Sequence, residues 1–404
     1  MYLMDNSYNL FQFVIRRTTV YSGKSAINII PQIFKNFKKE RIMLFTDQGI
    51  KNAGVLDRVL RVFEGLGDDM PKIVYIYDQV EAEAKISRIK ECIKIAEENQ
   101  IDCLLGIGGG SVLDTVKATK WLMYNKGKDI ESIFSGSPTY VEKWPVAQNM
   151  DIPHVAVPTT AGTGTESSTT AALLDEATNR KVALLNPFLA ADIALLDPEM
   201  TVTLPRSLTA GTGLDAFCHS FESFFSPAAN PLSDANAKEG MHLVAKYLPT
   251  AVKDGSNLEA RENMLLASAL GIAAFGYTGM ARASIHNIAI GFALKYDKPH
   301  CVGIPTLLPA VVECIPEWYA YRCKEFAQVV GIEKSFQTDE EAYKAVLTWL
   351  KEFIASVGVS AKFADVKLSD VDLEDIVQIV DKKVASFSKI PAEKIRMVAK
   401  MVTQ

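Results

Sequence analysis

The two halves of the chain differ in hydrophobic pattern, and this difference limits the folds it can adopt. In the first half, short apolar runs rich in β-branched residues alternate with longer charged segments of helical spacing, such as Ile86 to Glu98. Strands that alternate with helices in this way form parallel sheets covered on both faces. We predict strands at residues 41–45, 72–76, 102–106, 154–157 and 193–196.

The strand pattern ends near Leu204, and segments of helical length separated by prolines follow. Residues 342–357 and 371–386 carry apolar residues three and four positions apart, as amphipathic helices do. We therefore predict an α/β domain with a doubly wound parallel sheet over residues 1–203. An all-helical domain is predicted over residues 204–404.

The composition argues against several classes of protein. The 404 residues are 48% hydrophobic, and 48 acidic against 43 basic residues give a net charge of -5, so nucleic acid or an anionic membrane surface is not a predicted partner. The longest apolar stretch, Met264 to Tyr277, is too short to span a bilayer, and the N-terminus lacks a signal-peptide pattern. Six scattered cysteines without CxxC spacing indicate free thiols. We predict a cytoplasmic protein that binds small molecules.

Two loops that follow predicted strands suit a phosphate-bearing ligand. Gly106-Ile-Gly-Gly-Gly-Ser111 precedes a helical segment, Val112 to Met123, so its backbone N–H groups can approach a pyrophosphate at a helix N-terminus. The alternative is a flexible strand-to-helix turn. The loop Pro158 to Ser168, rich in hydroxyl side chains, is either a nucleotide-binding loop or an ordinary Ser/Thr-rich helix cap. Asp47, which follows the strand at 41–45, either binds an adenosine ribose or caps the next helix.

One acidic residue and three of the five histidines form a candidate metal site. Asp215 and His219 are four residues apart, so on a helix they lie on one face. With His286 and His300 they would supply one carboxylate and three imidazoles, a set suited to Fe or Zn rather than Ca or Mg. Any single histidine is more often a core or surface residue, so this prediction depends on the combination.

The order of four motifs resembles that of a known family. They are Gly108-Gly-Gly-Ser-Val-Leu-Asp114 with Lys117, Pro158-Thr-Thr-Ala-Gly-Thr163, Gly213-Leu-Asp-Ala-Phe-Cys-His219, and His286 fourteen residues before Pro299-His300. With these motifs the chain resembles the iron-containing (group III) alcohol dehydrogenases over nearly its whole length.

This resemblance implies a dinucleotide-binding domain followed by a helical domain, in a homodimer or larger homo-oligomer. It implies a divalent metal, Fe²⁺ or alternatively Zn²⁺, held by Asp215, His219, His286 and His300. Asp47 is expected to favour NAD(H) over NADP(H). The resemblance also implies that the nicotinamide cofactor is contacted by Asp47, Gly109, Gly110, Ser111, Asp114, Thr159, Thr160, Thr163, Ser168 and Lys181.

The implied reaction is hydride transfer between NAD(H) and a small alcohol or aldehyde, with the metal as a Lewis acid. Two positions depart from the family pattern. Ile290 stands where many members carry a histidine thought to relay protons, and Cys301 replaces the usual glycine after Pro-His. Because the relay histidine is missing, we predict an enzyme that works mainly as an aldehyde reductase.

Arg282 is the clearest sequence signal for the substrate. It lies four residues before His286, so a helix over residues 282–290 would place Arg282, His286 and Ile290 on one stripe facing the metal. A guanidinium there would bind the sulfonate, phosphonate or carboxylate tail of an aldehyde, with Tyr277 shaping the pocket. Alternatively, Arg282 lies on the surface or pairs with a carboxylate.

Two other functions remain open at this point. A sugar-phosphate cyclase (lyase) of the dehydroquinate-synthase kind shares this architecture, although the ligand set and the Thr-rich loop argue against it. A non-catalytic scaffold is disfavoured because unused buried polar groups reduce stability.

Overall fold

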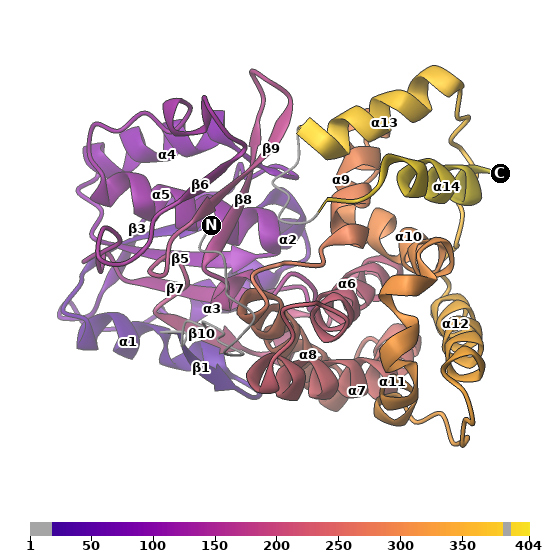
Figure 1. Ribbon diagram of the computed structural model, residues 1–404. Coiled ribbons are helices and arrows are strands. Elements are labelled where there is room, and N and C mark those ends of the chain that lie inside the picture. Colours follow the sequence, from indigo (N-terminus) through magenta and orange to yellow (C-terminus); the bar gives the residue numbers. More distant parts are fainter. Residues whose placement is uncertain (1–17, 383–388) are drawn as a thin grey trace.

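The computed structural model describes residues 18–382 and 389–404. The N-terminal segment, interpreted above as lacking a signal-peptide pattern, therefore lies outside the described residues. So does the end of the helix predicted at 371–386. Figure 1 shows an α/β half that contains the sheets, beside a half made of helices.

The α/β half is organised around a six-stranded sheet in which every neighbouring pair is parallel. The predicted doubly wound sheet is therefore confirmed, and five of its strands cover the five predicted runs. The sixth, β1, was not predicted because all its residues are exposed at the sheet edge. In spatial order the strands are β1 (Thr19–Ser22), β10 (Ile193–Leu196), β7 (His154–Pro158), β5 (Cys103–Gly108), β2 (Arg41–Phe45) and β3 (Lys72–Tyr77).

Alternate residues of β2 show how helices cover both faces of this sheet. Ile42 and Leu44 belong to the core formed with α1 (Ile30–Asn36) and α3 (Val55–Arg61). Met43 and Phe45 point to the other face, into the core formed with α4 (Ile86–Glu98) and α5 (Gly110–Tyr124). Successive side chains of a strand point to opposite faces, so each face needs an apolar cover.

A second, four-stranded sheet was not predicted. Its middle strands, β8 and β9, pair antiparallel through a turn at 176–179. Strand β9 begins with the charged residues Arg180 and Lys181 and is only partly buried, so it lacks the continuous apolar run by which the strands of the large sheet were predicted. In spatial order the strands are β4 (Ala84–Lys85), β8 (Thr170–Asp175), β9 (Arg180–Leu185) and β6 (Thr139–Val141).

The helical half begins with α6 (Arg206–Phe224), and the described residues beyond Leu196 contain no strand. From Leu214 to Phe224 every residue of α6 is buried, so this helix forms the centre of the domain. Within the described residues, no helix combines the length and apolar character required to cross a membrane. The other helices are α7 (Pro231–Lys253), α8 (Leu258–Tyr277), α9 (Ser284–Tyr296), α10 (His300–Cys314), α11 (Cys323–Val329), α12 (Asp339–Ser356), α13 (Asp370–Lys382) and α14 (Ala392–Thr403).

Candidate metal centre and cofactor loops

Three helices bring the four predicted metal ligands together. Asp215 and His219 share one face of α6, His286 lies in the first turn of α9, and His300 is the first residue of α10. The Nε2 atoms of His286, His300 and His219 lie 3.4, 3.5 and 4.0 Å from Asp215 Oδ1. His300 is the most accessible of the four, with 36% of its side chain exposed, so it marks the open side of the cluster.

The cluster has the features of a cation site. Asp215 Oδ1 and His286 Nε2 are buried, and neither atom has a hydrogen-bond partner within the described part of the chain. Buried polar atoms in proteins are almost always hydrogen-bonded, so unpartnered ligand atoms that converge on one point fit a metal ion. One carboxylate oxygen with imidazole nitrogens suits Fe²⁺ or Zn²⁺.

At two of the four residues, Asp215 and His219, the electrostatics favour the protonation states that a metal needs. Burial opposes ionisation of Asp215, but the surrounding imidazoles of His219, His300 and His286 outweigh burial and hold the pKa of this carboxyl well below its usual value. Burial lowers the pKa of His219 to about 3, which keeps its imidazole neutral. A carboxylate and a neutral imidazole are the forms that bind metals.

Glu222 is a functional candidate that the sequence analysis missed. It is fully buried on α6, and its Oε2 lies 2.5 Å from Nδ1 of His286. Its Oε1 accepts hydrogen bonds from the backbone N–H of Ile285 (2.6 Å) and from the Ser284 hydroxyl (3.2 Å). A carboxylate at Nδ1 fixes the imidazole so that Nε2 faces the other way, toward Asp215.

Burial works against a positive charge on His286, but the Glu222 carboxylate outweighs it and holds the pKa of His286 well above its usual value. The spacing of Asp215, His219 and Glu222, at positions i, i+4 and i+7 of one helix, was the available sequence signal.

The predicted cofactor residues lie at the carboxyl ends of neighbouring strands. The glycine loop follows β5, and the Thr-rich loop follows β7, whose Pro158 is in register with Gly108. Asp47 follows β2, whose Phe45 is in register with Gly106 of β5. Because β3 lies on one side of β2 and β5 on the other, the strand order reverses here, which is where open α/β sheets bind ligands.

The two loops are in close contact. A Cβ atom on Gly109 would lie 3.3 Å from Thr160 Cγ2, and one on Gly110 would lie 2.9 Å from Thr163 Cγ2. Helix α5 begins at Gly110 without a side-chain cap or an acidic residue in its first turn. Its first N–H groups can therefore serve an anion such as a pyrophosphate.

Several of the predicted cofactor residues also contact the protein itself. Asp47 caps α2 (Gln48–Asn52) by accepting a hydrogen bond from the backbone N–H of Ile50 at 2.9 Å, as one of the two alternatives predicted. The Ser111 hydroxyl accepts from the backbone N–H of Glu83 at 3.0 Å, and the Glu83 carboxylate forms an ion pair with Lys181.

Asp114, on α5, connects this helix to the Thr-rich loop and to β8. Its Oδ1 accepts hydrogen bonds from the Thr165 hydroxyl and from Nζ of the fully buried Lys117 (3.3 Å), and its Oδ2 accepts from the backbone N–H of Ala172 (3.1 Å). Of the remaining loop residues, Thr159 and Ser168 are buried, and the Thr159 hydroxyl has no hydrogen-bond partner in the described chain.

The prediction for Arg282 was wrong in one respect. Helix α9 begins at Ser284, so Arg282 lies in the preceding turn rather than on a helical stripe with His286 and Ile290. The chain turns sharply after α8 ends at Tyr277, because Gly279 and Met280 both adopt positive φ angles, 60° and 56°. The Arg282 guanidinium lies over the ring of Trp318, 4.3 Å from its centroid.

Comparison with known families agrees with this arrangement. The family model described as iron-containing alcohol dehydrogenase matches residues 17–198, and the C-terminal model of the Fe-containing alcohol dehydrogenase family matches residues 209–400. The chain belongs to the iron-containing alcohol dehydrogenase family. It is therefore an oxidoreductase, and the cyclase and scaffold alternatives find no support in these matches.

Individual members of the family differ in their named substrates. Long-chain-alcohol dehydrogenase 1 of Geobacillus thermodenitrificans (strain NG80-2) is 28% identical over 366 residues, which cover 90% of this chain and 89% of that protein. Sulfoacetaldehyde reductase of Bilophila wadsworthia (strain 3_1_6) is 31% identical over 290 residues, 72% of this chain and 71% of that protein. The sulfoacetaldehyde reductase of Bifidobacterium kashiwanohense, solved in complex with NAD+, has the same fold, with a TM-score of 0.80 and 23% identity over 97% of this chain and 98% of that one.

Proposed function

We propose that this oxidoreductase transfers hydride between NAD(H) and a small alcohol or aldehyde at a divalent metal, and that it works mainly as an aldehyde reductase. The observation that carries this proposal is the convergence of two buried ligand atoms without hydrogen-bond partners, Asp215 Oδ1 and His286 Nε2, with two further histidines. Burying polar atoms without partners reduces the stability of the folded protein unless a cation binds to them.

Asp215, His219, His286 and His300 would hold the metal, with Fe²⁺ favoured and Zn²⁺ as the alternative. The bound ion supplies Lewis-acid polarisation of the carbonyl oxygen. Glu222 would orient His286, and the burial of Asp215, His219 and His286 would exclude bulk water from all but the His300 side.

The cofactor would lie along the carboxyl ends of β2, β5 and β7. The N-terminus of α5 would receive the pyrophosphate, and Asp47 would accept hydrogen bonds from the adenosine ribose and repel a 2'-phosphate, which favours NAD(H). The proposed contact residues are Asp47, Gly109, Gly110, Ser111, Asp114, Thr159, Thr160, Thr163, Ser168 and Lys181.

The reductive direction rests on Ile290. Reduction consumes one aldehyde, one NADH and one proton and yields an alcohol and NAD+. The developing oxyanion is basic enough to take its proton from water, whereas the reverse reaction needs a base to remove the proton from the alcohol. Ile290 on α9 cannot act as that base, so removal of the proton is expected to limit the maximal rate of oxidation at saturating alcohol.

We further propose that the preferred aldehyde is anionic, which the two sulfoacetaldehyde reductases among the relatives and the position of Arg282 support. A cytoplasmic location fits the six free cysteines. A homodimer or larger homo-oligomer is proposed from the family resemblance.

The test is to follow NADH at 340 nm with small aldehydes in one direction and with the matching alcohols and NAD+ in the other. We expect reduction to be faster in the wild type, and the variant Ile290→His to gain rate selectively in oxidation. Equal rates in both directions, or no gain from Ile290→His, would contradict the proposed direction. Absence of NADH turnover with every aldehyde would contradict the function.

A further inference from the structure

Arg282 is a charged side chain without an acidic partner. Its Nη1 atom is buried, and no residue of the described chain accepts a hydrogen bond from it. Burial lowers the pKa of Arg282, which shows that the charge is partly desolvated. A desolvated charge without a partner is unfavourable, and an anionic ligand would remove that cost.

This guanidinium lies close to the polar groups behind the metal centre. Arg282 lies two residues before Ser284, and its guanidinium lies over Trp318, the residue before Tyr319. The Ser284 hydroxyl links Glu222 to the Tyr319 hydroxyl, at 3.2 and 2.9 Å. Arg282 therefore borders the hydrogen-bonded groups that position His286.

Trp318 holds the guanidinium in a fixed orientation. Arg282 lies 4.3 Å from the centroid of the indole, which is in the short helix η6 (Pro316–Trp318). A guanidinium held over an aromatic face uses that face for the cation–π contact, so its N–H groups remain available to an oxyanion. The side chain is thus oriented before a ligand arrives.

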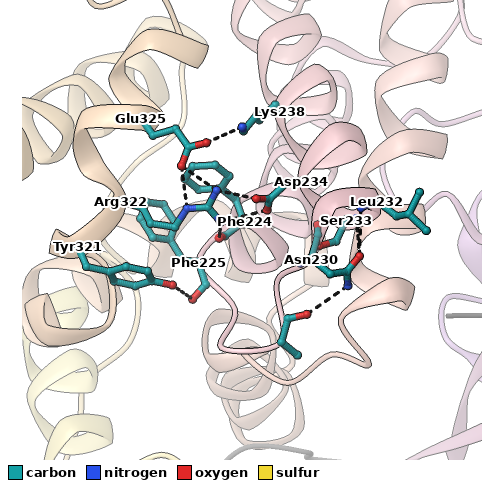
Figure 2. A network of polar contacts seen from close by, with 11 residues as sticks. Phe224, Phe225, Asn230, Leu232, Ser233, Asp234, Lys238, Tyr321, Arg322 and Glu325 are labelled. Carbon is teal, nitrogen blue, oxygen red and sulfur yellow. Dashed lines mark hydrogen bonds and ion pairs between the residues drawn. The ribbon is translucent and has the colours of Figure 1, made fainter. Parts of the chain in front are cut away.

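A network of polar contacts fixes the segment that carries Trp318 to the end of α6 (Figure 2). Arg322 donates to the Phe224 carbonyl (2.6 Å) and to both oxygens of Asp234 (3.0 and 2.8 Å), and it pairs with Glu325 (2.8 Å). The Tyr321 hydroxyl donates to the Phe225 carbonyl at 3.1 Å. The segment that carries Trp318, over which the Arg282 guanidinium lies, is therefore attached to the helix that carries Asp215 and His219.

We propose that Arg282 binds the anionic end of the substrate, so that the enzyme prefers small aldehydes carrying a sulfonate, phosphonate or carboxylate. This proposal rests on the proposed function. The guanidinium offers paired N–H donors to two oxygens of such a group, which a neutral aldehyde cannot use. The reaction is unchanged: NADH supplies the hydride to the carbonyl carbon, and the carbonyl oxygen gains a proton.

The first experiment compares two aldehydes of similar shape. Sulfoacetaldehyde and 3,3-dimethylbutanal differ in a tetrahedral sulfonate against a tert-butyl group, so charge is the main difference. We expect Arg282→Leu to lower kcat/KM for sulfoacetaldehyde by roughly 10- to 100-fold, mainly through KM, with little change for 3,3-dimethylbutanal. Arg282→Lys keeps the charge but not the paired donors, so its kcat/KM for sulfoacetaldehyde is expected to lie between those of the wild type and Arg282→Leu. Arg61→Leu, at an exposed position in the α/β half, is the control for net charge.

A second experiment does not depend on turnover. Ethanesulfonate, which carries the anionic group and no carbonyl, is expected to raise the melting temperature of the wild type and of Arg61→Leu but not of Arg282→Leu. If Arg282→Leu loses activity equally on both aldehydes, or if ethanesulfonate stabilises it as much as the wild type, the tail-binding role is wrong. If the wild type reduces neither aldehyde, the proposed function fails, and the ethanesulfonate shift still decides whether Arg282 binds anions.

Discussion

Replacing Glu222 by glutamine tests how the metal centre is positioned. The substitution keeps the size of a fully buried side chain, removes its charge and replaces one accepting oxygen by a donating nitrogen. Glu222 now accepts hydrogen bonds on both oxygens, from His286 Nδ1 on one side and from the Ile285 N–H (2.6 Å) and the Ser284 hydroxyl on the other. A glutamine has one accepting oxygen and one donating nitrogen, so it cannot satisfy both sides.

Neither orientation of the amide in Glu222→Gln satisfies both sides and also leaves His286 Nε2 free to bind a metal. If the amide nitrogen faces Ile285, it meets a backbone N–H. If it faces His286, the imidazole must move its proton to Nε2, and that nitrogen can no longer bind a metal. A mismatched buried hydrogen bond costs about 1–3 kcal/mol, which corresponds to a metal affinity lower by roughly 10- to 100-fold.

The assay is a chelator-competition titration of Fe²⁺ or Zn²⁺ into metal-free protein. Glu142→Gln is a matched control, because Glu142 is also buried (8% exposed) and accepts hydrogen bonds on both oxygens, but lies in the α/β half. Its Oε2 accepts from Trp121 Nε1 (2.8 Å) and Asn186 Nδ2 (2.7 Å), and its Oε1 accepts from the Tyr140 hydroxyl (3.1 Å) and Lys128 Nζ (3.3 Å). We expect weaker metal binding for Glu222→Gln alone. Unchanged affinity, or an equal loss in both variants, would refute the positioning role.

Three further substitutions test other parts of the account. Gly110→Ala places a Cβ atom 2.9 Å from Thr163 Cγ2, so we expect the Kd for NADH to rise about tenfold in fluorescence titrations, and an unchanged Kd would contradict the contact between the loops. Burial lowers the pKa of His154 well below 6.5, so the unfolded chain binds a proton that the folded chain does not. Stability from this group is complete above about pH 6.5 and falls by up to about 1.4 kcal/mol per pH unit below it. His154→Leu is expected to flatten urea-unfolding stability between pH 6.5 and 5, and a slope equal to that of the wild type would exclude this histidine as its source. Asp114→Asn removes the negative charge beside the buried Lys117, so we expect a loss of about 3 kcal/mol in urea unfolding, and a loss below about 1 kcal/mol would show that the pair matters little.

The parts of the fold that could be predicted from sequence are those set by local pattern. The buried parallel strands are continuous apolar runs, and α4 has apolar residues at helical spacing, so their bounds were predicted to within one or two residues. The pairing of β8 with β9 lacked such a signal, because β9 begins with Arg180 and Lys181 and only its middle residues are buried. Local pattern therefore predicted the large sheet but not the small one.

The candidate site shows the same limit. Helical spacing predicted that Asp215 and His219 lie on one face of a helix. The order of the motifs added His286 and His300, which are distant in sequence. The placement of Arg282 failed because the chain leaves helical geometry at Gly279 and Met280, and no periodicity reveals two positive φ angles. Glu222 was overlooked although it lies on the same face of α6 as Asp215 and His219. Its role depends on His286, which comes from another helix.

The most direct test of the central claim is to measure NADH oxidation with a small aldehyde as a function of metal bound per chain. The protein would be stripped with a chelator under anaerobic conditions and titrated with Fe²⁺ or Zn²⁺. If Asp215, His219, His286 and His300 hold the metal at which hydride is transferred, the rate will be negligible without metal, rise to a plateau at one ion per chain, and stay negligible in Asp215→Ala. Metal-free protein that oxidises NADH with aldehyde as fast as the loaded protein would contradict the account.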